Sequence, residues 1–107
     1  AERFIKRFID VINLRINGVV DAFQKDISRA GGDENSIVQA ILKVRKEMQF
    51  LNQAGNLSVF PEEQRNQILS MINEQADIMQ KSLEDSAKAD RSGRLSSIVR
   101  NNRINSL

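Results

Sequence analysis

The sequence predicts an all-α fold, a three-helix antiparallel bundle or an assembly of coiled-coil-like helical hairpins, followed by a basic, partly mobile C-terminal tail. In three consecutive segments, apolar residues recur at steps of about four and three, the spacing that keeps one helix face against a partner. Most of the five glycines and the single proline fall between these segments. At 107 residues, the chain is long enough for one domain with a modest core.

The first helix is expected over residues 2–30. Its apolar stripe consists of Ile5, Ile9, Ile12, Ile16, Val19 and Phe23. Asn17-Gly18 is also a signal for a two-residue β-hairpin turn, because apolar and polar residues alternate before it. A hairpin closed there would leave Leu14 opposite Asp21, whereas the helical stripe continues through Gly18 in register. We therefore expect a continuous helix about 43 Å long, at about 1.5 Å per residue.

The second helix is expected over residues 34–54. Asp33 is a candidate N-cap for it, and Ser36 with Gln39 three residues later is an alternative capping box. Its apolar stripe consists of Ile37, Ile41, Val44, Met48 and Leu51. The linker over residues 56–60 is too apolar for a free loop, so we expect it to pack over one end of the bundle. Its apolar residues are Leu57, Val59 and Phe60.

The third helix is expected over residues 61–90, which completes a bundle domain of residues 1–90. Pro61 suits a helix start, where its missing N–H is not needed. The buried face is expected to contain Ile68, Ile72, Ala76, Met79 and Leu83. Residues 61–90 carry three basic and seven acidic side chains, whereas residues 91–107 carry four arginines and no acid. We expect this basic tail to be partly mobile. The residues that would line one face of a short helix within it are Leu95, Ile98 and Val99.

The composition excludes several classes of chemistry. The chain has no cysteine and no histidine, so it cannot build disulfides, thiolate or imidazole metal sites, or His- or Cys-based catalytic triads. Adjacent carboxylates such as Glu62 and Glu63 point about 100° apart on a helix and do not face one cleft. No glycine-rich phosphate-binding loop is present. We expect no catalytic residue, no metal and no cofactor, and we expect that the protein is not an enzyme.

An excess of apolar residues near the start of the chain is the main candidate for a binding surface. Phe4 and Phe8 widen the apolar face of the first helix beyond a two-helix seam. We expect a face for a partner or for oligomerisation made of Phe4, Ile5, Phe8, Ile9, Ile12, Leu57 and Phe60. The same stretch mixes cations with apolar groups, as interfacial membrane helices do. Asp10, Asp21 and Asp26 interrupt the positive charge, so we do not expect a membrane surface to be the partner.

The leading functional prediction is a non-enzymatic, self-associating helical protein–protein interaction module. By analogy of fold, it would offer a helical groove as small adaptors, assembly scaffolds and secretion chaperones do. The alternative is a nucleic-acid-binding accessory protein that contacts phosphates through Arg91, Arg94, Arg100 and Arg103. The tail has no aromatic residue for base stacking, and its arginines would serve equally well against an acidic protein or the acidic third helix. No apolar run reaches the ~18 residues of a membrane span and no signal peptide is visible, so we expect a cytoplasmic protein.

Overall fold

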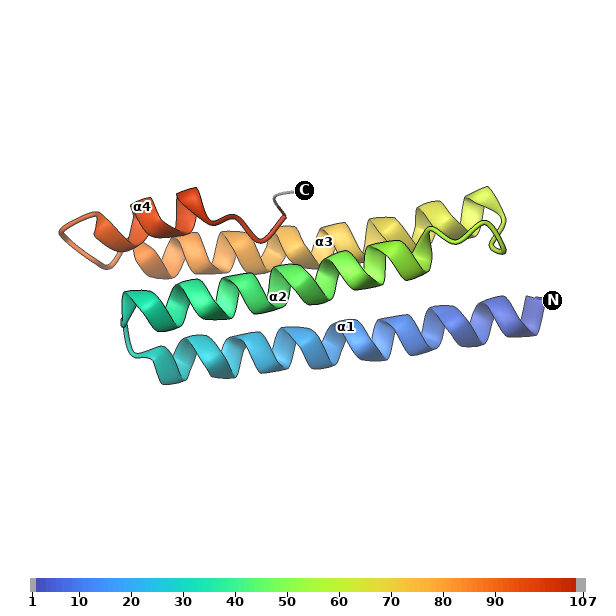
Figure 1. The fold of residues 1–107 in the computed structure, drawn as a ribbon, viewed down its shortest axis with the longest axis horizontal. Coiled ribbons are helices and arrows are strands. Elements are labelled where there is room, and N and C mark those ends of the chain that lie inside the picture. The colour runs from blue at the N-terminus through green and yellow to red at the C-terminus, as the bar shows by residue number, and fades with distance from the viewer. Residues whose placement is uncertain (1, 106–107) are drawn as a thin grey trace.

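The computed structural model describes residues 2–105 and places most of them in four α-helices (Figure 1). The helices are α1 (Glu2–Ala30), α2 (Glu34–Gly55), α3 (Glu62–Ala87) and α4 (Arg94–Asn101). No strand occurs among the described residues, so the all-helical class is confirmed and the hairpin at Asn17-Gly18 is wrong. α1 continues through Gly18 because Ile16 and Val19, on either side of it, are buried on the same helix face.

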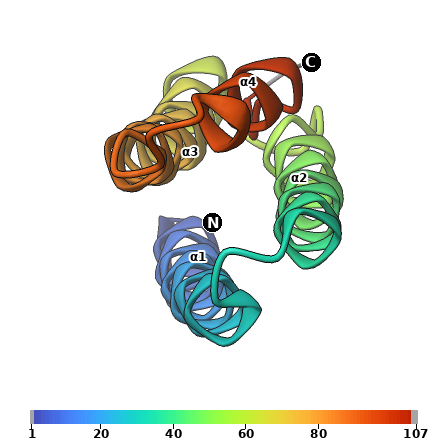
Figure 2. The same cartoon turned by 90° about the vertical axis from the view of Figure 1, so that its left-hand side faces the viewer.

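α1, α2 and α3 lie side by side in alternating directions, and α4 packs against α2 and α3 (Figure 1). The end-on view shows α4 over the groove between α2 and α3, on the side away from α1 (Figure 2). The molecule is elongated, with dimensions of 53 × 21 × 18 Å. The start of α1 and the α2–α3 connection lie at one end, and the α3–α4 connection lies at the other. The described part of the chain thus has one helix more than the three that the sequence predicted.

The segment expected to be a mobile tail is packed onto the rest of the molecule in its described part. Val99 and Ile104 are each only 1% exposed and belong to the main core, and Leu95 is partly buried against it. Charge and Ser and Asn content favoured a mobile tail, whereas the aliphatic side chains of the segment are buried and hold it against the core. Residues 1, 106 and 107 lie outside the described residues.

The N-terminus of α2 is capped by Asp33, the first of the two predicted alternatives. The Asp33 carboxylate accepts hydrogen bonds from the Ser36 hydroxyl at 2.6 Å and from the Ser36 backbone N–H at 3.0 Å. These two bonds, the hydroxyl first, hold the pKa of Asp33 below its ordinary value. The cap satisfies a backbone donor that has no partner within the helix.

α3 differs slightly from its predicted bounds at both ends. Pro61 is the N-cap rather than the first helical residue, and the helix ends at Ala87 rather than at residue 90. The Asp90 carboxylate accepts a hydrogen bond from the Leu95 backbone N–H at 3.1 Å, so Asp90 belongs to the start of α4 instead. Gly93, with φ +73°, provides the left-handed conformation of the turn between the two helices.

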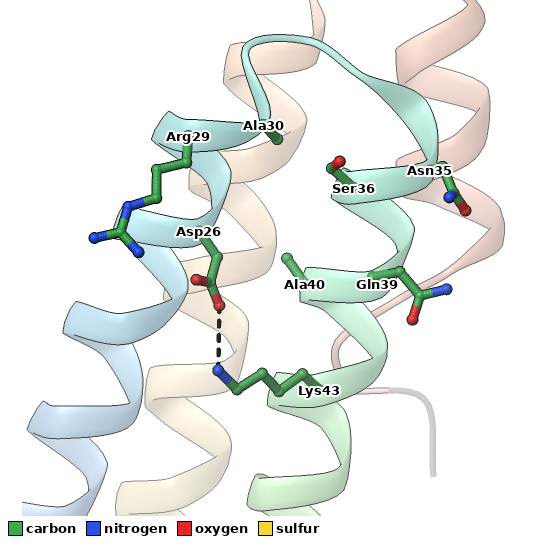
Figure 3. Close-up of a pocket in the computed structure, with 8 residues that line it drawn as sticks. All are labelled: Asp26, Arg29, Ala30, Asn35, Ser36, Gln39, Ala40 and Lys43. Carbon is green, nitrogen blue, oxygen red and sulfur yellow. Dashed lines mark ion pairs between the residues drawn. The ribbon is translucent and has the colours of Figure 1, made fainter.

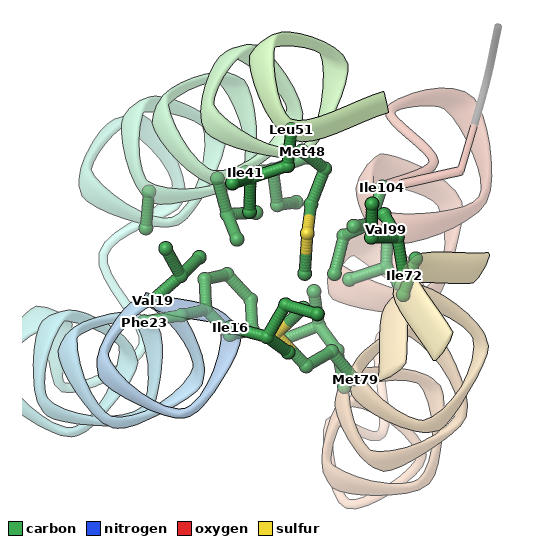
Figure 4. Close-up of a cluster of buried hydrophobic side chains, with 14 of the residues drawn as sticks. Ile16, Val19, Phe23, Ile41, Met48, Leu51, Ile72, Met79, Val99 and Ile104 are labelled. Carbon is green, nitrogen blue, oxygen red and sulfur yellow. The ribbon is translucent and has the colours of Figure 1, made fainter. Parts of the chain in front are cut away.

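The core follows the predicted stripes along the length of the molecule (Figure 4). Its buried members on α1 to α3 include Ile12, Ile16, Val19, Phe23, Ile37, Ile41, Val44, Met48, Leu51, Ile68, Ile72, Ala76, Met79 and Leu83. Burial of each large aliphatic or aromatic side chain contributes roughly 1.5–3 kcal/mol. α2 and α3 approach closely at Gly55, where an added Cβ would clash with the Ile68 Cγ2 methyl group. This contact explains why a residue without a side chain ends α2.

Candidate functional site

The seven residues predicted to form a partner-binding face lie near one end of the molecule, but they do not form one exposed surface. The structure buries Ile12 and Phe60, half-buries Ile5, Phe8 and Ile9, and exposes Phe4 and Leu57. The prediction is wrong for Ile12 and Phe60, whose exposed fractions are 4% and 2%. Both side chains are buried within the chain and are not accessible to a partner in this conformation.

Phe60 closes this end of the molecule by packing on two aromatic side chains of α1. Its ring centroid lies 4.4 Å from that of Phe8, in a tilted arrangement, and 6.4 Å from that of Phe4, in a stacked arrangement. Aromatic pairs add about 0.5–1.5 kcal/mol beyond the area that they bury. The linker between α2 and α3 thus packs over the end through Phe60, while Leu57 and Val59 stay exposed.

We name four exposed side chains, on the first turns of α1 and on the α2–α3 linker, the exposed apolar end. They are Phe4, Val11, Leu57 and Val59, and each is between 52% and 66% exposed. Phe4 and Leu57 were among the predicted residues, whereas Val11 and Val59 were not. The signal for both was present, because Val11 lies beside the apolar stripe of α1 and Val59 lies in the apolar linker.

The same end of the molecule carries charges of both signs on different helices. The first two turns of α1 carry three exposed basic side chains, Arg3, Lys6 and Arg7, and one exposed acid, Glu2. α3 begins with two exposed acidic side chains, Glu62 and Glu63, which favour the positive end of the helix dipole. Both helix starts lie at the end where Phe60 packs (Figure 1). The exposed apolar end is therefore bordered by a basic and an acidic helix start.

The four arginines of the predicted basic tail are exposed, and two of them form ion pairs within the chain. Arg94 pairs with Glu34 of α2. Arg103 pairs with Glu84 of α3, with 3.3 Å between Nη1 and Oε1. These acids lie on two different helices, so the segment bridges α2 and α3 electrostatically. Exposed pairs of this kind contribute only about 0–1 kcal/mol each.

A buried amide on α3 binds the backbone of the segment after α4. Gln80 is 2% exposed, and its Oε1 accepts a hydrogen bond from the Ile104 backbone N–H at 2.8 Å. Its Nε2 donates to Glu84 Oε1 at 2.9 Å and, at 3.5 Å, to the Val99 carbonyl. The side chain thus satisfies a donor and an acceptor of the packed segment in a region from which water is excluded.

A guanidinium group on α2 binds the same segment from the other side. Arg45 donates from Nε and Nη2 to the Arg103 carbonyl, at 3.0 and 2.7 Å. The side chains of Asn105 and Asp77 form a further hydrogen bond to α3. Side chains from both walls of the α2–α3 groove therefore bind main-chain groups of the segment that lies between them.

Neither Gln80 nor Arg45 was predicted from the sequence as a functional residue. Each directly follows a residue of the apolar stripe, Met79 and Val44 respectively, and so lies beside the buried face of its helix. A polar residue at such a position is a weak signal by itself. The role of such a residue can be assigned only when the structure shows which segment it binds.

Open grooves are also present between the helices of the described part of the chain. A polar hollow of about 320 Å³ lies between α1 and α2 near their connecting turn, and Asp26 and Lys43 form an ion pair of 3.5 Å there (Figure 3). Asp26 is the only carboxylate that lines this hollow, so the hollow lacks the facing carboxylates of acid–base catalysis. An apolar groove of about 260 Å³ lies between α1 and α3. Its lining includes Val20, Phe23 and Ile27 of α1 with Ile78, Ser82, Leu83 and Ser86 of α3.

Within residues 2–105, no group of three or more carboxylates is placed so that it could hold a metal ion. No helix in this range is both long and apolar enough to cross a bilayer. Comparison with known proteins gives no match, whether with family models, characterised proteins or solved structures. The function of the chain has to be inferred from the surfaces described above.

Proposed function

We propose that this chain is a non-enzymatic helical protein–protein interaction module that self-associates through the exposed apolar end. The observation that carries the proposal is the exposure of Phe4, Val11, Leu57 and Val59 at the end of the molecule that Phe60 closes. Single exposed apolar side chains are ordinary, whereas several at one end of a small domain are typical of an interaction surface. Each of these side chains is already partly buried, so its burial in a contact would contribute less than the roughly 1.5–3 kcal/mol of a fully exposed side chain.

A second copy of the chain is the occupant that the charges favour. In a two-fold symmetric dimer, the same patch on both copies makes the contact, so apolar residues meet apolar residues. The basic start of α1 in one copy can then face the acidic start of α3 in the other, around the exposed apolar end. Such complementary charges would fix the register of the contact more than they would add affinity.

Nucleic-acid binding through the arginines after residue 90 has less support. Arg94 and Arg103 already pair with carboxylates of this chain, and α4 is fixed against α2 and α3. Titration of a labelled DNA duplex at two salt concentrations would distinguish this alternative. Four phosphate contacts would give a slope of about −3.6 in log K against log salt concentration. Absence of binding at low salt would remove the alternative.

The self-association is tested by sedimentation equilibrium over a low to high micromolar range. We expect Leu57→Asp and Val59→Asp to shift the protein towards monomer, because each places a charge in the contact. Both side chains are exposed, so far-ultraviolet circular dichroism should keep its helical signal. Ile78→Asp is the matched control, because Ile78 is 53% exposed, close to the 52% of Leu57, and lies in the middle of α3, away from the exposed apolar end. A monomer at high micromolar concentration, or equal dissociation by the control, would contradict the proposal.

A further inference from the structure

Residues 94–105 lie in the α2–α3 groove in the way that a bound peptide lies on a receptor. We infer that this groove is a binding site for an amphipathic segment of a partner protein, and that residues 94–105 occupy it as a replaceable intramolecular ligand. The inference goes beyond self-association, because it concerns a different surface from the exposed apolar end. Three features of the groove support this role: hydrogen bonds to the backbone of the segment, sockets for its apolar side chains, and the short length of the helix that occupies it.

Backbone recognition makes the groove tolerant of different occupants. Gln80 and Arg45 bind the carbonyl groups of Val99 and Arg103 and the N–H group of Ile104. Every peptide presents these main-chain groups, so any segment that adopts the same conformation can make the same bonds. Peptide-binding proteins commonly combine main-chain hydrogen bonds for affinity with side-chain sockets for specificity.

The sockets define the chemistry of the expected partner segment. Val99 and Ile104 are each 1% exposed, and Leu95 is partly buried one helical turn before Val99. The two acids at the groove edges, Glu34 and Glu84, both pair with arginines of the segment. The partner should therefore present a helix of about two turns with aliphatic side chains four residues apart. A third aliphatic side chain should follow five residues after the second, as Ile104 follows Val99. Basic side chains should face Glu34 and Glu84.

Residues 94–105 have features that favour local detachment from the groove. α4 has eight residues, whereas isolated helices need about 12–15 residues to be even marginally stable in water. Its helicity therefore depends on the groove. An exposed turn at residues 88–93, with Gly93 at φ +73°, joins it to α3. Local opening of such a segment requires less free energy than unfolding of the whole core.

The test uses the full chain and a fluorescein-labelled synthetic peptide of residues 91–105, with fluorescence anisotropy as the readout. Ile104→Asp in the chain weakens the tethered segment and leaves the groove residues unchanged. In the unmodified chain, residues 94–105 already occupy most grooves, which lowers the apparent affinity for added peptide. We therefore expect the Ile104→Asp variant to bind the peptide at least about tenfold more tightly than the unmodified chain. Asp90→Ala removes a hydrogen-bond acceptor for α4 outside the groove, so we expect a smaller gain in the same direction.

Three controls assign the binding to the groove. Gln80→Leu added to Ile104→Asp should abolish the gain, because the peptide backbone then loses its buried partner. A peptide that itself carries Ile104→Asp should not bind. Arg100→Ala is the matched control on α4, because Arg100 is exposed and should leave the affinity unchanged.

The inference is overturned if Ile104→Asp and Asp90→Ala keep their helical signal and bind the peptide no better than the unmodified chain. Sedimentation separates the partner from a second copy. If Ile104→Asp abolishes self-association while Leu57→Asp leaves it intact, the groove exchanges α4 between copies and the assignment to a partner protein is wrong. If self-association depends on Leu57 alone while the peptide still binds, both surfaces act as proposed here.

Discussion

The two apolar grooves beside α3 differ in what their walls offer to a bound segment. The groove towards α2 contains Gln80 and is faced by Arg45, and it is covered by α4 and the residues that follow. The groove towards α1 is lined by polar side chains too, Gln24 and Ser28 of α1 with Ser82 and Ser86 of α3. These side chains are exposed, whereas Gln80 is only 2% exposed. Buried main-chain groups must be hydrogen-bonded, so an apolar floor alone does not hold a segment that leaves its helical conformation. In the filled groove the buried amide of Gln80 and the guanidinium group of Arg45 supply these hydrogen bonds, whereas the polar side chains of the open groove are exposed.

The largest expected effect compares two isoleucines of α3. Ile72 is 0% exposed and lies near Val99 and Ile104 on the covered side (Figure 4). Ile78 is 53% exposed in the open groove. Ile72→Ala should destabilise the fold by about 2–5 kcal/mol, because it removes packed methyl groups and leaves a cavity. Ile78→Ala should cost less than about 1 kcal/mol, because its side chain already contacts water. Urea denaturation followed by circular dichroism measures the free energy of unfolding of both variants. Equal losses of stability would contradict the expected difference between the two sides of α3.

A smaller effect is expected for the polar contacts that distinguish the grooves. Gln80→Leu should cost about 1–3 kcal/mol, because it leaves the buried N–H of Ile104 without an acceptor. Ser82→Ala, on the open side of the same helix, should change stability by no more than about 0.5 kcal/mol. Chemical denaturation of both variants checks the difference. A neutral Gln80→Leu would show that apolar packing alone holds the segment.

The smallest expected effect is a dependence of α4 on pH. The hydrogen bond from the Leu95 backbone N–H, followed by that from the Ser92 hydroxyl, holds the pKa of Asp90 below its ordinary value. The folded state thus favours the ionised carboxylate, and this stabilisation is complete above the ordinary aspartate pKa of about 3.9. It is lost as pH falls through the lowered value.

Amide exchange of α4 in acid checks this dependence. The α4 amides should lose protection at a higher pH than the α2 and α3 core amides do. In Asp90→Asn, this particular pH dependence should be absent. A variant that loses protection at the same pH as the unmodified chain would show that Asp90 does not control the start of α4.

The sequence was sufficient to predict what depends on local periodicity. The predicted stripes of α2 and α3 are buried, and that of α1 is buried from Ile12 onwards, whereas Ile5 and Ile9 are half-buried. The helix bounds differ from the expected ones by at most three residues, and those of α1 agree with the prediction. Asp33 capping was also visible, because the cap and its partner Ser36 are three residues apart. These features depend on residues that are close in the sequence, so their spacing contains the necessary information.

The covered groove could not be predicted in the same way, because its contacts join distant residues. Gln80 and Ile104 are 24 residues apart, and Arg45 and Arg103 are 58 residues apart. The aliphatic spacing of Leu95 and Val99 indicated a short helix, but nothing local indicated where that helix packs. The groove forms only when α2 and α3 assemble, so the roles of Gln80 and Arg45 emerge from tertiary structure.

Native-state hydrogen exchange, followed by NMR at increasing sub-denaturing urea concentrations, tests the central claim most directly. The claim is that residues 94–105 open as a unit while α1, α2 and α3 stay folded. It predicts that the amides of Val99 and Ile104 exchange with a lower opening free energy, and a weaker urea dependence, than those of Ile41 and Met79 in the core. If all four amides exchange with one free energy and one urea dependence, the segment opens only by global unfolding and is not a replaceable ligand.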